Sequence, residues 1–185
     1  MAVPMKILLS ASLLLLAACR SDPIHFHTLT PLQGGTEPAT GADIQIEGIS
    51  VPPQVDRPQM VIRQGDSGLV ILETEWWGAS LVDELSSALE NRLADSSLPR
   101  KVSVRLDVQR FDSLPGQYAL LDVRWRLRHG GQAEQPLVSC RSTLKSPAGP
   151  GIDALVIAHQ QNIERLAQAI VKAAGDSNGA CPPSP

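Results

Sequence analysis

Two long stretches of the chain alternate apolar and polar residues, and this pattern restricts the possible folds more than any other feature. Residues 102–109 and 118–127 both alternate with a period of two, which is typical of strands that bury one face. A third stretch, 134–145, continues the pattern, and Pro115-Gly116 and Gly130-Gly131 supply turn residues between the three. The alternation predicts an antiparallel three-stranded meander with one dry face and one wet face.

The apolar face of such a sheet must be buried against other elements, and two amphipathic helical patterns in the sequence can do this. Residues 81–93 carry apolar side chains at spacings of three and four, after Ser80 as the N-cap of a helix that ends near Ser96. A longer stripe covers residues 152–174, and Gly175 is well placed to end it. We therefore expect an α+β fold, a two-layer sandwich of a mostly antiparallel sheet with two amphipathic helices on one face.

The N-terminus carries a short apolar segment that ends at a cysteine. Lys6 precedes it, residues 7–18 are mostly apolar, and the segment closes as Leu-Ala-Ala-Cys, with Ala18 directly before Cys19. Its length is well below the roughly 20 apolar residues of a membrane-spanning helix. We expect a secretory signal, either of the lipoprotein type or an ordinary one that happens to contain a cysteine.

The Leu-Ala-Ala-Cys ending resembles the bacterial lipobox. The resemblance implies cleavage between Ala18 and Cys19, a diacylglycerol on the sulfur of Cys19 and an acylated amine, and several acyl chains attach a protein stably to a membrane. Arg20 stands where aspartate favours the inner membrane in Gram-negative lipoproteins. We therefore expect an outer-membrane lipoprotein that faces the periplasm.

Strand patterns before the first helix complete the expected domain. They lie at residues 24–29, 43–51, 59–63 and 69–73. In the stretch 43–51 the alternation of apolar and polar residues is interrupted at Gly48, which predicts a bulge or a bend. The expected organisation is a signal peptide at 1–18, a lipidated N-terminus and tether with a short first strand at 19–42, an α/β lipoprotein domain at 43–174 and a flexible C-terminal tail at 175–185.

Charge and motifs argue against two classes of function. Removal of residues 1–18 takes one lysine and leaves 15 basic against 19 acidic side chains, a net charge of −4, and no basic cluster indicates a nucleic-acid partner. The sequence has no Gly-rich phosphate loop, no Gly-x-Ser-x-Gly and no His-Glu-x-x-His. We expect a non-enzymatic protein without a cofactor.

Cysteines and histidines suggest a disulfide more than a metal site. If Cys19 carries lipid, Cys140 and Cys181 remain as a pair in an oxidising compartment. The alternative for Cys140 is an inert buried thiol on a strand. His25 and His27 alternate on the first strand, but two ligands do not make a metal site.

Two further groups of residues are candidates for partner contact. Arg124, Arg126 and Arg128 point to one face of the predicted meander. Further candidates for this face are Arg105, Arg141 and Lys145, with Asp107 and Asp122 among them. The face is either a solvated one with salt bridges or a surface for an acidic partner or lipid headgroup. Trp76 and Trp77 precede the first helix, and we expect one to fill the end of the core and the other to lie in a protein interface.

Residues 51–63, Val-Pro-Pro-Gln-Val-Asp-Arg-Pro-Gln-Met-Val-Ile-Arg, carry a resemblance to a known family. The stretch resembles the Asp-Arg-Pro-Gln run of the ABC-type transport auxiliary lipoproteins, the family of paraquat-inducible protein C. Later parts are similar in order: a tryptophan and helix at 77–93, Arg-Phe-Asp at 110–112 and a closing helix at 155–173. Phe-His-Thr-Leu at 26–29 departs from the paired tyrosines that often precede Thr-Leu in the family.

The resemblance implies a role beside MCE-domain proteins, which carry lipids between the two membranes of the envelope. This chain would be the outer-membrane component, would do no chemistry itself, and would form a homo-oligomer such as a ring. Asp56 and Arg57 then contact the partner or serve the fold, because Pro58 stiffens the backbone beside them. The alternative function is a regulator or scaffold of another cell-envelope machine.

Overall fold

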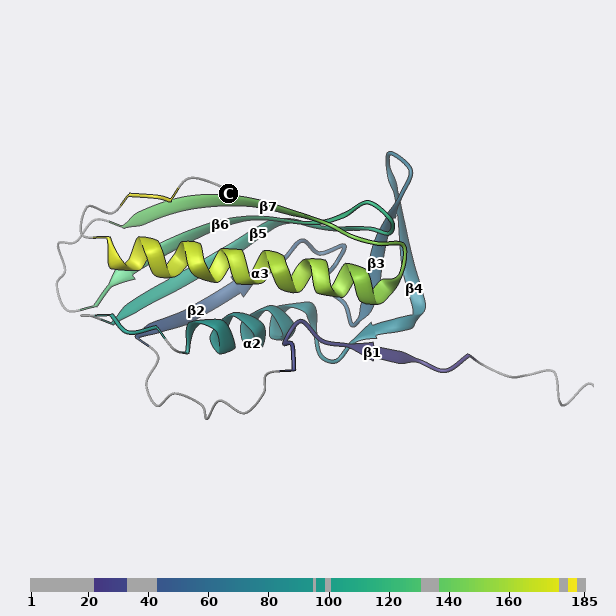
Figure 1. The fold of residues 1–185 in the computed structure, drawn as a ribbon, viewed down its shortest axis with the longest axis horizontal. Helices are drawn as coiled ribbons and strands as arrows, with labels where there is room; N and C mark the ends of the chain where they lie inside the picture. Colours follow the sequence, from purple (N-terminus) through teal and green to yellow (C-terminus); the bar gives the residue numbers. More distant parts are fainter. Residues whose placement is uncertain are drawn as a thin grey trace, which may run out of the picture.

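The computed structural model describes residues 22–32, 43–94, 96–98, 101–130, 137–176 and 180–182. The elements are β1 His25–His27, β2 Ile44–Ser50, β3 Gln59–Gln64, β4 Gly68–Trp77, α2 Leu81–Leu93, β5 Val102–Leu114, β6 Tyr118–His129, β7 Val138–Pro147 and α3 Ile152–Gly175. Both helices and the meander β5-β6-β7 are where the sequence predicts them, and the α+β class is confirmed (Figure 1). Among the described residues, neither helix combines the length and hydropathy needed to cross a bilayer.

The strands form two sheets, which local sequence patterns did not predict. The larger sheet has the order β2-β5-β6-β7, with β5, β6 and β7 antiparallel and β2 parallel to β5. The register of β2 shifts between Ile46 and Gly48, which confirms the irregularity predicted at Gly48. The smaller sheet has the order β1-β4-β3, and Arg63 of β3 donates to Asp112 of β5 across 2.7 Å.

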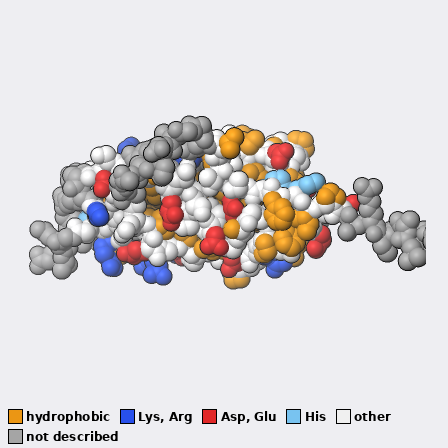
Figure 2. All heavy atoms as spheres, turned by 90° about the horizontal axis from the view of Figure 1, so that it is seen from below, with side chains coloured by type: hydrophobic (Ala, Val, Ile, Leu, Met, Phe, Trp, Pro, Cys, Tyr) orange, Lys and Arg blue, Asp and Glu red, His pale blue; other side chains and the backbone are white. Residues whose placement is uncertain are grey.

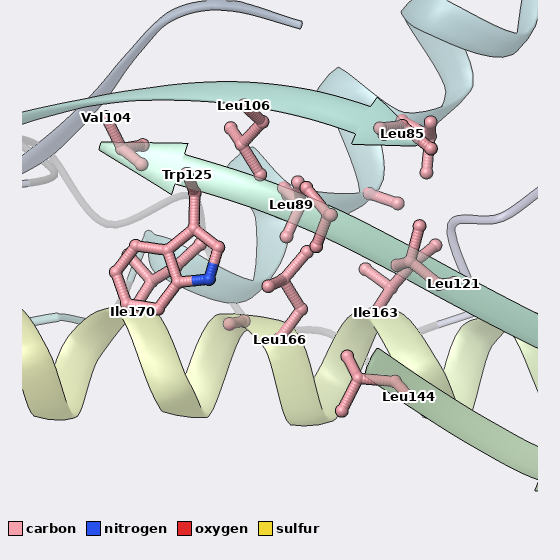
Figure 3. Close-up of a cluster of buried hydrophobic side chains, with 14 of the residues drawn as sticks. Leu85, Leu89, Val104, Leu106, Leu121, Trp125, Leu144, Ile163, Leu166 and Ile170 are labelled. Carbon is pink, nitrogen blue, oxygen red and sulfur yellow. The ribbon is translucent and has the colours of Figure 1, made fainter. Parts of the chain in front are cut away.

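The core lies between the larger sheet and the two helices, which lie together on one face of that sheet (Figure 1). Figure 3 shows leucine and isoleucine side chains of both helices meeting the inward side chains of β5, β6 and β7. Trp125 at the centre is 1% exposed, and its indole N–H donates to Ser142 Oγ at 3.0 Å. The period-two alternation therefore separates a dry face from a wet one, as expected.

Several element boundaries differ from the prediction. Strand β5 continues to Leu114 and β6 to His129, and β7 spans Val138–Pro147 where 134–145 was expected. Helix α2 ends at Leu93 and not near Ser96, because the amide and hydroxyl of Ser96 both bond back to the Leu93 carbonyl, at 3.0 and 2.6 Å. Strand β4 continues past residue 73 to Trp77, because its last residues pair in parallel with β1. The tryptophan pair therefore belongs to a strand, and its two side chains point to opposite faces.

Candidate functional site

The outer face of the larger sheet, opposite the helices, carries a row of exposed arginines. We call this surface the arginine face, and it consists of Arg105, Arg124, Arg126, Arg128 and Arg141. Their neighbours along each strand are the buried core residues, so the alternation that fills the core also turns the guanidinium groups outward. The sequence predicted that Arg124, Arg126 and Arg128 share a face and indicated Arg105 and Arg141 as candidates to join them, and the register places all five there.

Only one arginine of the arginine face has a carboxylate partner among the described residues. Arg141 donates from Nε and Nη2 to Asp122 at 2.9 and 2.6 Å. This hydrogen-bonded guanidinium lowers the pKa of Asp122, and a bond from Thr143 adds to the effect. Asp107 instead accepts from Ser50 and Gln109, each at 2.8 Å. Asp107 also lies directly opposite Arg124, and Glu47 lies beside Arg105, Arg126 and Arg128. Neither carboxylate forms an ion pair with these arginines in the described part of the chain, so the arginines outnumber the carboxylates on this face.

The register places two pairs of these arginines opposite each other, although Arg124 also lies opposite Asp107. Arg105 pairs with Arg126 across β5 and β6, and Arg124 pairs with Arg141 across β6 and β7. Like charges directly opposite each other on a sheet are destabilising, and nothing in the fold requires them. An open hollow of about 760 Å³ lies over this region, and its polar lining consists of four of the five arginines, Asp107, Ser50 and Ser139. Of the two predicted interpretations, this arrangement favours a surface for an anionic partner.

The segment with the Asp-Arg-Pro-Gln run packs beside Trp77. The amide of Trp77 donates to the carbonyl of Pro58 at 2.7 Å, and Val55 lies in the core. Asp56 is exposed, whereas Arg57 is half-buried with its Nε buried and without a partner in the described part of the chain. The backbone contacts favour a structural role for this segment, and the exposed Asp56 carboxylate remains a candidate for partner contact.

The two tryptophans lie in different surroundings, in agreement with one core and one surface position. Trp77 is 3% exposed and packs edge-on against Phe111, with ring centroids 6.1 Å apart. Trp76 is half-buried on the opposite side and contacts Phe26 edge-on at 6.3 Å. Sequence reasoning missed the contact with Phe26, because only the pairing of β1 with β4 brings the two rings together.

Glu75 ties the first strand to the body of the domain, which the sequence also did not predict. Its carboxylate accepts from His25 Nδ1 at 3.1 Å and from His27 Nε2 at 2.6 Å. The bond from His27, followed by that from His25, lowers the pKa of Glu75 despite some desolvation. No group of three or more metal-ligating side chains occurs in the residues that the structure describes.

The contact closest to a nucleophile and base lies in the interior. Ser113 Oγ is 2.9 Å from His159 Nε2, but the two residues are only 2% and 0% exposed. The His159 ring stacks on Phe111 at 3.9 Å, and burial lowers its pKa to about 3. A substrate in solvent has no contact with either group, so this pair belongs to the core.

A disulfide joins Cys140 of β7 to Cys181, with Cα atoms 5.5 Å apart. It closes a loop across a sequence separation of 41 residues, which includes the whole of α3. Of the other predicted positions, Ala18 and Cys19 lie outside the described residues, as do residues 177–179 and 183–185 of the predicted tail.

Loss of this disulfide is expected to lower the stability of the domain. Cys181→Ser should reduce the free energy of unfolding by about 2–4 kcal/mol, because the unfolded chain regains the freedom of the closed loop. Denaturant unfolding under oxidising and reducing conditions measures the effect. The reductant should bring the unmodified chain to the level of the variant, and equal stability of the two oxidised proteins would show that no bridge forms.

Comparisons with known proteins agree with the predicted resemblance. A family model described as the ABC-type transport auxiliary lipoprotein component matches residues 27–171. No curated protein matches the sequence. A solved structure of an uncharacterized protein is similar with a TM-score of 0.63 and 18% identity, over 82% of this chain and 98% of the other. A Xanthomonas campestris protein of family DUF330 is similar with a TM-score of 0.60 and 19% identity, over 80% and 92%. Both likenesses concern the fold.

Proposed function

Because the chain belongs to the family of ABC-type transport auxiliary lipoprotein components, we propose that it is a lipid-anchored adaptor of an MCE-type lipid transport system. In this proposal Cys19 carries the lipid in the outer membrane, and the domain faces the periplasm. The protein acts by contact and not by catalysis, and the family is not a known enzyme family. The lipobox at the N-terminus and the exposed arginine face support the proposal.

The observation that supports the adaptor role is the row of five exposed arginines, of which only Arg141 has a carboxylate partner among the described residues. A surface with facing like charges is destabilising for the isolated domain. An acidic partner relieves that repulsion, and complementary charge gives specificity and fast association. We propose that an acidic segment of the MCE-domain protein binds the arginine face beside Ser139, where Ser50 and Gln109 already hydrogen-bond the Asp107 carboxylate. Copies of this chain in a homo-oligomer such as a ring would each present one such face.

Charge reversal on the arginine face is expected to weaken binding to the partner. Arg126→Glu should lower the affinity for the MCE-domain protein about tenfold at low ionic strength, and added salt should shrink the difference. Quantitative co-purification, or binding of the two purified proteins at two salt concentrations, measures the change. The stability of the domain should not fall, because the substitution removes the repulsion between Arg105 and Arg126.

Lys172→Glu is the matched control, because it makes the same charge change at an exposed position of α3, on the side of the helices. It should bind like the unmodified chain. Equal weakening by both variants would mean that net charge and not the arginine face matters. Co-purification of another envelope machine in place of an MCE-domain protein would support the alternative, a regulator or scaffold, and reject the transport role.

A further inference from the structure

An exposed apolar patch lies where β1 meets the end of β4. We call it the aromatic patch, and it consists of Ile24, Phe26 and Trp76. Ile24 is 44% exposed and Phe26 is 66% exposed, and the Phe26 ring meets the edge of the half-buried Trp76. Figure 2 shows hydrophobic side chains, in orange, gathered beside the pale blue histidines of β1. The patch is thus open to solvent in the part of the chain that the structure describes.

The geometry of the smaller sheet creates this patch. Strand β1 is an edge strand, and its parallel register sets Phe26 opposite Trp76. The next residue, Trp77, turns into the core and leaves the Phe26 and Trp76 rings on the outer side of β4. Exposed apolar area costs about 25 cal/mol per Å², so two adjacent aromatic rings outside the core indicate a surface that is covered when the protein works.

The patch is firmly attached to the domain. The carboxylate of Glu75 holds both histidines that flank Phe26, and the amide of Gly78 donates to the His27 carbonyl at 2.8 Å. Directly after β1, buried Glu84 accepts from the Leu29 amide at 2.7 Å and from a neighbouring hydroxyl at 2.8 Å. These bonds hold β1 against β4 and α2, so the patch cannot move away from the domain without breaking them.

The chain between the lipidated position and the patch is short. Phe26 follows Cys19 by seven residues, and even a fully extended chain of that length spans only about 25 Å. A lipid on the Cys19 sulfur holds that end of the chain at the surface of a bilayer. The anchor therefore keeps the aromatic patch within about 25 Å of the attachment point at the membrane.

We propose that the aromatic patch inserts into the headgroup region of the bilayer that carries the lipid anchor. Tryptophan is enriched at this depth, because its ring is apolar and its N–H is polar. Here the Trp76 N–H is already bonded to the Glu73 carbonyl at 2.9 Å, so the apolar ring is free to meet lipid. The patch is a second contact that orients the domain on the membrane. This inference rests on the lipidation proposed for Cys19.

Fluorescence of the tryptophans can test this contact without relying on lipidation in cells. A chain that begins at Cys19 is coupled through its free thiol to a maleimide phospholipid in phosphatidylcholine vesicles, with Cys140 and Cys181 kept oxidised. Trp77 and Trp125 are 3% and 1% exposed, so Trp76 is the tryptophan that lipid can reach. With lipids brominated in the upper acyl chain, part of the emission should be quenched and the remainder shifted to the blue.

Three variants test whether the quenching comes from the aromatic patch. Trp76→Phe should abolish the lipid-dependent quenching, and Phe26→Ser should reduce it. Leu69→Ser is the matched control, because Leu69 is 44% exposed but lies seven residues away on β4, about 23 Å, and it should leave the quenching unchanged.

If brominated lipid quenches the coupled chain no more than it quenches Trp76→Phe, the proposal is overturned. A blue shift that grows only with the density of protein on the vesicle would also overturn it, since a second copy would then cover the patch. Failure of the lipid anchor is read separately, from the mass of the processed N-terminus in cells, so the two failures are distinguishable.

Discussion

Cys19→Ser is expected to abolish membrane attachment of the chain. In the proposed anchor the Cys19 sulfur receives the diacylglycerol. A hydroxyl does not replace it, so the variant should accumulate without lipid, either soluble or with residues 1–18 still attached. Each buried methylene contributes about 0.8 kcal/mol to membrane binding, and loss of all acyl chains removes far more than the aromatic patch supplies. Fractionation of cells followed by the mass of the chain in each fraction measures the outcome.

The matched control for this prediction is Cys181→Ser, which replaces a cysteine far from the N-terminus and should leave the chain in the membrane fraction. The critical species is the processed one. If Cys19→Ser is cut to its mature length and still sediments quantitatively with membranes after a salt wash, the lipid anchor is the wrong explanation. The chain would then be held at the membrane by protein contacts alone.

The second large effect concerns His159 and the dependence of stability on pH. Burial lowers the pKa of His159 to about 3 in the folded protein, whereas an unfolded chain titrates its histidines near 6.5. As the pH falls, the unfolded chain therefore takes up a proton that the folded chain refuses. The stabilisation is complete above pH about 6.5 and is lost progressively down to pH about 3. At about 1.4 kcal/mol per unit, the loss at pH 5 is about 2 kcal/mol.

Urea unfolding at pH 7 and pH 5 tests this prediction. His159→Gln lacks the titrating ring, so its free energy of unfolding should fall by about 2 kcal/mol less than that of the unmodified chain between the two pH values. Its stability at pH 7 should be lower, because the stacking on Phe111 is lost. Gln161→Ala, at a neighbouring exposed position of α3, should keep the original slope, and an unchanged slope in His159→Gln would contradict the assignment.

Local patterns in the sequence predicted the elements well but did not predict how distant strands pair. The alternation in β5, β6 and β7, the cap at Ser80 and the stop at Gly175 all depend on neighbours along the chain. The parallel pairing of β2 with β5, and of β1 with β4, depends on residues more than 45 positions apart. No periodicity encodes such a partner, so the second sheet and the extension of β4 to Trp77 required the structure.

For the candidate surfaces too, local patterns were predictable from the sequence and contacts between distant residues were not. Period two was enough to place Arg124, Arg126 and Arg128 on one face. It did not show that Asp122 would bind Arg141 while Asp107 bonds to Ser50 and Gln109. The aromatic patch could not be predicted from the sequence, because Phe26 and Trp76 meet only through the register of β1 on β4.

We propose the arginine face as the surface through which this lipoprotein contacts its transport partner. Photo-crosslinking in living cells tests it most directly, with a photoreactive residue at position 126 and, for comparison, at position 172 on α3. Position 126 should yield an adduct with an MCE-domain protein, and position 172 should not. An adduct formed only from position 172, or none from 126 while the chain is membrane-bound, would contradict the account.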